Sequence, residues 1–97
     1  MQKYSDFLQE LVMVKHDVDQ ELYKRKAGIA GDGTVGQLEL ALDELNTLES
    51  LLKNDQIPPK GKRWLEIAWH ITDSWDDKSI LGEKILKLVN YYQDKLD

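Results

Sequence analysis

The amino-acid sequence predicts an all-α fold, an antiparallel up-down-up-down four-helix bundle formed by a single domain, residues 1–97. Leucine dominates the apolar residues while valine and threonine are sparse, which favours helix over sheet. Glycine, proline and polar residues interrupt the chain at only three places, residues 28–36, 58–61 and 73–79. Short connections between four helical segments make neighbouring helices antiparallel.

The first helix is expected over about residues 4–26. Its apolar positions recur at helical spacing: Phe7, Leu11, Val14, Val18 and Leu22. The basic residues 24–26 fall in the last turn, where cations meet the negative end of the helix dipole. Gly28 then supplies the expected stop.

The second helix is expected over residues 35–53. Thr34 and Gln37 form the pattern of a capping box, in which each side chain satisfies a backbone N–H at the helix start. An apolar stripe follows: Leu38, Ala41, Leu42, Leu45, Leu48 and Leu52.

The third helix is expected over about residues 60–74, because proline is tolerated in a first helical turn. Trp64, Ala68, Ile71 and Trp75 lie on one stripe, which Leu65 and Trp69 widen. An apolar arc of this width predicts a mostly enclosed helix, with Trp75 covering the end of the core rather than facing solvent.

The fourth helix is expected over about residues 77–96, capped by Asp76 or Asp77. Its stripe consists of Leu81, Ile85, Leu88 and Tyr92, which leaves Tyr91 half exposed.

Composition excludes several classes of protein. A net charge of −5, from 13 basic and 18 acidic residues, excludes nucleic-acid binding through a basic face. The absence of cysteine excludes disulfides and thiolate zinc sites and agrees with a reducing compartment. The chain has no apolar run of the ~20 residues that span a bilayer and no signal-peptide pattern, so a cytoplasmic location without membrane contact is expected.

Two patterns that resemble catalytic or ligand sites are better explained structurally. Residues 31–36 match the dinucleotide pattern G-x-G-x-x-G, but a helix precedes them where that motif needs a strand, and Asp32 would repel a pyrophosphate. His16 and His70 lack a glutamate three residues before them, so neither fits a di-iron bundle. Glu66 and His70 share a helical face but offer only one edge of a metal site. No catalytic residue, metal or cofactor is therefore expected.

The acidic residues are unevenly distributed. Residues 27–57 contain six acids and one base, and residues 64–77 contain four acids and no base. In an up-down bundle these acids gather at one end, around Trp75. The candidate partner-binding residues are Trp75, Asp73, Asp76, Asp77, Glu39, Asp43 and Glu44.

Three interpretations of this acidic end remain open. It can be a solvated surface, since acids favour the first turns of helices and aid solubility. It can bind a basic protein partner through acids around an aromatic anchor. It can hold magnesium, as in all-helical nucleotide pyrophosphohydrolases, but Asp73 and Asp76 have no Glu-x-x-Glu upstream. A structural or adaptor bundle is a further alternative.

A basic group, Lys60, Lys62 and Arg63, lies at the start expected for the third helix. Cations are unfavourable there, so ion pairs with Asp55, Asp94 and Asp97 at the same end are expected. The alternative is a site for an acidic partner.

Residues 57–64 (IPPKGKRW) and 71–77 (ITDSWDD) resemble the small acidic immunity proteins of bacterial toxin systems, including contact-dependent ones. The resemblance implies a cytoplasmic, non-catalytic helical antitoxin. Such an inhibitor blocks the basic active site of a cognate toxin, for example a nuclease. No motif of known role is matched, so no functional residue follows from the resemblance.

Overall fold

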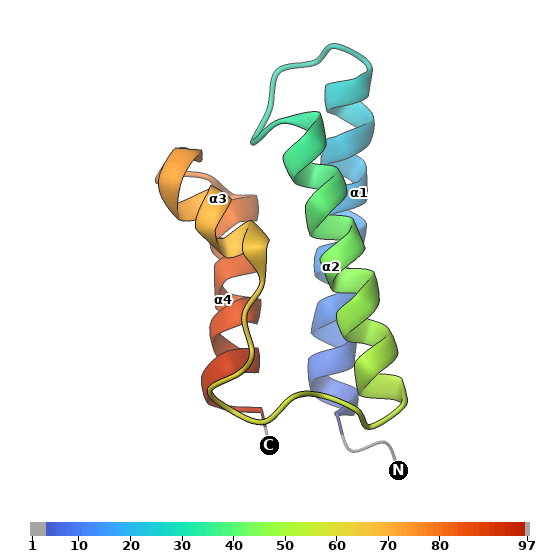
Figure 1. The fold of residues 1–97 in the computed structure, drawn as a ribbon. Helices are drawn as coiled ribbons and strands as arrows, with labels where there is room; N and C mark the ends of the chain where they lie inside the picture. Colours follow the sequence, from blue (N-terminus) through green and yellow to red (C-terminus); the bar gives the residue numbers. More distant parts are fainter. Residues whose placement is uncertain (1–3, 97) are drawn as a thin grey trace.

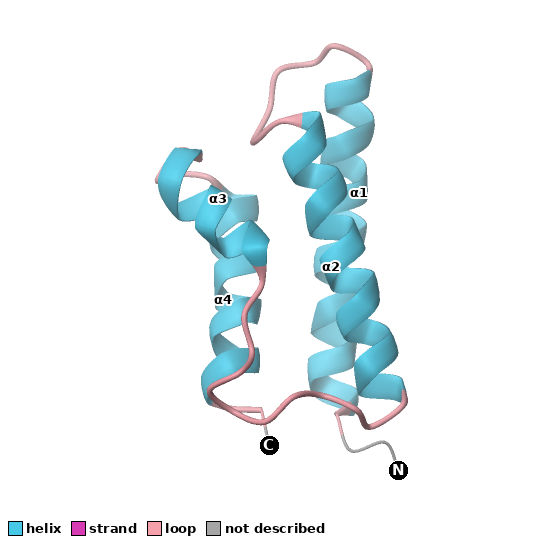
Figure 2. Cartoon of the chain, in the orientation of Figure 1, coloured by secondary structure: helices cyan, strands magenta, loops and turns pink. Residues whose placement is uncertain are grey.

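A computed structural model describes residues 4–96 of the chain. Its helices are α1 (Ser5–Lys26), α2 (Val35–Lys53), α3 (Glu66–Ser74) and α4 (Ile80–Asp94), and residues 4–96 contain no strand (Figures 1 and 2). The prediction of an all-α fold is confirmed. None of these helices combines the length and apolar character needed to cross a membrane.

Helices α1 and α2 lie side by side and agree with the predicted boundaries (Figure 1). Thr34 and Gln37 form the expected capping box, each side chain accepting from the other's backbone N–H at 3.1 Å. Gly28 ends α1 with φ +82°, so that the N–H groups of Gly28 and Ile29 close back onto Arg25 and Lys24. Local sequence therefore determined both of these helix ends.

Helix α3 is shorter than predicted and begins at Glu66, not near residue 60. Residues 56–65 are irregular because Pro58 and Pro59 cannot donate backbone hydrogen bonds and Gly61 has φ +93°. The start of α3 therefore lies six residues later than the proline pattern indicated.

The predicted apolar stripe of the third helix is confirmed at Leu65, Ile71 and Trp75 but is wrong at Trp64 and Trp69. The core receives Leu65, Ile67, Ile71 and Trp75, whereas Trp64 is 65% exposed and Trp69 is 74% exposed. Trp69 lies about 200° around the helix from Ile67, on the opposite face. Helix α3 is thus not enclosed and presents a tryptophan to solvent.

Helix α4 begins at Ile80, and its cap is Ser79, whose hydroxyl accepts from the Gly82 N–H at 2.9 Å. The predicted caps Asp76 and Asp77 precede this position, and the Asp76 carboxylate accepts from the Lys78 N–H instead.

The buried residues form one core. Helix α1 packs against α2 and α4, and α3 also packs against α2 and α4. Tyr92 is buried and Tyr91 is about half exposed, as predicted, and both rings stack on Phe7.

Candidate functional site

The first turn of α3 is held by a carboxylate from α2. Leu65 occupies the N-cap position and supplies no side-chain hydrogen bond. Instead, the Glu44 carboxylate accepts from the backbone N–H groups of Glu66, at 2.7 Å, and Ile67, at 2.8 Å. The carboxylate of a neighbouring helix thereby satisfies two backbone donors that have no partner within α3. Its negative charge also interacts favourably with the positive end of the helix dipole. Glu44, expected to bind a partner, thus has a structural role.

The last turn of α3 is tied to α2 by Gln37. The Trp75 indole Nε1 donates to Gln37 Oε1 at 2.8 Å, and Gln37 Nε2 donates to the Ser74 hydroxyl at 3.2 Å. Sequence reasoning assigned Gln37 only to the capping box. Its additional role depends on a residue 38 positions away, which no local pattern indicates.

Trp75 covers the end of the core, as predicted, and is only 7% exposed. Its ring lies against Gly33 and Gly82, where a Cβ atom would approach it to 2.5 Å and 3.2 Å. The neighbouring acids are exposed, but the indole itself lies beneath the surface.

The seven candidate partner-binding residues are distributed over more than one surface. Trp75, Asp76 and Asp77 line a hollow of about 410 Å³ between α3 and α4. Asp43 and Glu44 instead line a groove of about 280 Å³ between α2 and residues 58–65. Glu39 lies one turn before Asp43 on α2, lines a further hollow with it, and is 4.0 Å from Lys26 of α1.

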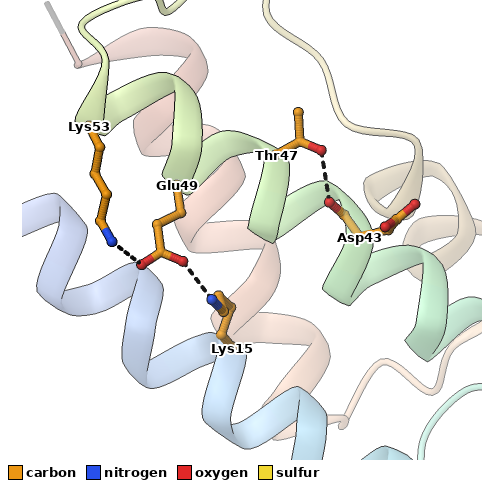
Figure 3. Close-up of polar contacts among 5 residues, drawn as sticks. All are labelled: Lys15, Asp43, Thr47, Glu49 and Lys53. Carbon is orange, nitrogen blue, oxygen red and sulfur yellow. Dashed lines mark hydrogen bonds and ion pairs between the residues drawn. The ribbon is translucent and has the colours of Figure 1, made fainter.

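The acids of α2 differ in their surroundings (Figure 3). Glu49 bridges Lys15 of α1, at 2.5 Å, and Lys53, at 3.2 Å. The hydrogen bond from Lys15 lowers the pKa of Glu49, against the opposing effect of burial. At Asp43 the Thr47 hydroxyl donates to the backbone carbonyl at 3.0 Å, which leaves the carboxylate exposed.

The acids of residues 64–77 form no ion pair within residues 4–96. Glu66, Asp73, Asp76 and Asp77 are all exposed, and none forms an ion pair within residues 4–96. The acidic partners in the ion pairs found within residues 4–96 are Asp17, Glu39, Glu49 and Glu83. The carboxylates of α3 and the turn after it are therefore exposed and free of ion pairs within residues 4–96, although Lys78 follows them in the chain.

Sequence reasoning missed the exposed face of α3. Glu66, Trp69 and Asp73 follow one another at spacings of three and four residues, which aligns them along one side of the helix. The spacing of these three residues could be read from the sequence, but the sequence did not show whether Ile67 or Trp69 is buried. The exposed face was missed because the helix was expected to begin earlier and to bury Trp69.

Arg63 belongs to the interior. It is 8% exposed and donates to the carbonyl oxygens of Pro58, at 2.6 Å, Tyr92, at 2.8 Å, and Leu96. Its guanidinium also lies over the Tyr92 ring, 5.4 Å from the centroid. The prediction that Arg63 pairs with carboxylates is wrong for the described residues, since it caps the C-terminal end of α4; Asp97 lies outside them.

No group of three or more His, Asp or Glu side chains within residues 4–96 is arranged to hold a metal ion. His16 is exposed and His70 is partly exposed. Comparisons of the chain with models of protein families, with curated proteins and with solved structures find no match.

Proposed function

We propose that this chain is a non-catalytic protein-binding module that uses an acidic surface to block a basic partner. The observation that carries the proposal is the set of four exposed carboxylates of residues 64–77, which have no base among them and no ion pair within residues 4–96. Uncompensated charge of this kind steers an oppositely charged partner and raises its association rate.

The partner we infer is a bacterial toxin domain with a basic active site, such as a nuclease. A nuclease binds a polyanion, so its cleft is positively charged, and an acidic inhibitor competes directly for that cleft. In this proposal the protein is a cytoplasmic immunity protein. Its helices form an antiparallel up-down-up-down bundle that presents Asp73, Asp76 and Asp77, with Glu39 and Asp43 extending the negative field along α2.

The test is co-expression with the protein encoded immediately upstream. We expect the chain to restore growth and to bind the purified toxin domain in calorimetry. Reversing Asp76 and Asp77 to lysine should weaken binding at least tenfold. Each close charge pair across an interface contributes more than ~1.4 kcal/mol, and this free energy corresponds to a tenfold change in Kd.

A matched control reverses Glu10 and Asp19 of α1, which are also exposed, so that the net charge changes by the same amount. This control should bind almost as the unaltered chain does. Failure of the unaltered chain to neutralise the toxin would overturn the immunity role. Equal affinities of the two reversal variants would overturn the assignment of the acidic surface.

A further inference from the structure

The solvent face of α3 combines an exposed indole with two carboxylates. Trp69 is 74% exposed, with Glu66 three residues before it and Asp73 four residues after it. Residues at these spacings are neighbours on a helix surface, so both carboxylates flank the indole. A tryptophan is the best cation–π acceptor among the side chains, and the flanking carboxylates strengthen the attraction for a cation.

This face is held in place before any partner arrives. An isolated helix of nine residues is marginal in water, yet α3 is fastened at both ends to α2. The Glu44 carboxylate holds its first turn, and Gln37 holds Ser74 and Trp75 at its end. Because the helix is already ordered, binding to it costs little conformational entropy.

We infer that Trp69, Glu66 and Asp73 form the anchor point for an arginine of the partner protein. The guanidinium stacks on the Trp69 ring while its N–H groups donate to the two carboxylates. Arginine suits this arrangement better than lysine, because its planar guanidinium both stacks on aromatic rings and donates in a fork to carboxylates. The inference rests on the proposed function and replaces Trp75 with Trp69 as the aromatic anchor.

The charge of this face argues against other occupants. A second copy of the chain related by twofold symmetry would bring the same carboxylates together, where like charges repel. Nucleic acids and anionic membranes are repelled for the same reason. A basic protein segment is the complementary occupant.

Octa-arginine is the probe for a test by NMR, in which the indole N–H signals of Trp64, Trp69 and Trp75 report on three positions. At 150 mM NaCl we expect the Trp69 indole and the backbone amides of residues 66–73 to shift, while buried Trp75 does not. Octa-lysine, of equal charge, should bind at least threefold more weakly.

Two pairs of variants distinguish a specific anchor from general charge attraction. Trp69→Ala should weaken the binding of octa-arginine about fivefold, which is the loss expected for an exposed cation–π contact. Trp64→Ala should stay within twofold, because Trp64 is similarly exposed but lies before α3 and has no carboxylate three or four residues from it. Likewise, Glu66→Gln with Asp73→Asn should weaken binding more than Glu10→Gln with Asp19→Asn.

Equal losses in Trp69→Ala and Trp64→Ala, or in the two charge-matched pairs, would overturn the inference. Circular dichroism of each variant checks that its helices are intact. If the toxin is neutralised and Trp69→Ala binds it normally, only the anchor is wrong. If octa-arginine docks on Trp69 while no toxin is neutralised, the immunity role is wrong and the anchor stands.

Discussion

The cap that α2 provides for α3 gives the sharpest stability prediction. Replacing Glu44 with glutamine keeps the size and helix propensity of the side chain but removes its charge and one of its two acceptor oxygens. The amide N–H groups of Glu66 and Ile67 now share one neutral oxygen in place of the carboxylate that lies 2.7 and 2.8 Å from them.

The expected cost follows from these two contacts. A lost side-chain cap typically costs ~1 kcal/mol, and loss of a negative charge near a helix N-terminus costs ~0.3–1 kcal/mol. Water can replace the acceptor at the exposed Glu66 amide but less readily at the part-buried Ile67 amide. We therefore expect Glu44→Gln to lower the free energy of unfolding by about 1 kcal/mol, with Tm lower by about 4–8 °C.

Urea unfolding followed by tryptophan fluorescence measures the free energy, and hydrogen exchange measures protection of the Ile67 amide. The matched control is Asp43→Asn, which removes the same charge from the preceding residue, whose carboxylate is exposed. It should change stability by less than ~0.5 kcal/mol. If Glu44→Gln and Asp43→Asn have the same urea midpoint, and the Ile67 amide exchanges equally slowly in both, the capping role is refuted.

Two further predictions concern α2 and the loop that precedes it. Glu49→Gln should destabilise by about 1–2 kcal/mol at pH 7, because the hydrogen bond from Lys15 lowers the pKa of this 17%-exposed carboxylate below its ordinary 4.5. That stability is present above pH 4.5 and is lost as the pH falls through the lowered pKa of Glu49. The urea midpoints of wild type and variant should therefore converge in acid. A difference in midpoint that does not change with pH would contradict the ion pair. Gly33→Ala should cost at least ~2 kcal/mol and alter the near-UV circular dichroism, since φ is +68° and the new Cβ would meet the Trp75 ring at 2.5 Å. Gly36→Ala, which meets no atom closer than 3.9 Å, should be neutral or stabilising, and equal losses at both glycines would contradict the packing argument.

The acidic surface could be predicted only in part. Sequence identified Asp73, Asp76 and Asp77 as a stretch without bases, and all three are exposed. It could not show that Glu44 is engaged in capping or that the face of α3 with Trp69 and Asp73 is the exposed one. Both facts depend on how α3 packs against α2, which involves residues more than 20 positions apart.

Arg63 shows the same limit from the opposite direction. Its position after Pro59 suggested a cation at an unfavourable helix start, but the helix begins later. Arg63 donates to the carbonyl oxygens of Tyr92, in the last turn of α4, and of Leu96, just after it. The unfavourable dipole contact inferred from sequence is a favourable one in space.

The sequence by itself determined the helical class, the extents of α1 and α2, and their capping by Gly28 and Thr34. These features depend on side chains within a few residues of one another, so local patterns encode them. Only the tertiary structure decided which face of α3 is buried. Apolar residues lie on both sides of the stripe formed by Ile71 and Trp75, so packing of Ile67 into the core selects the buried side and leaves Trp69 exposed.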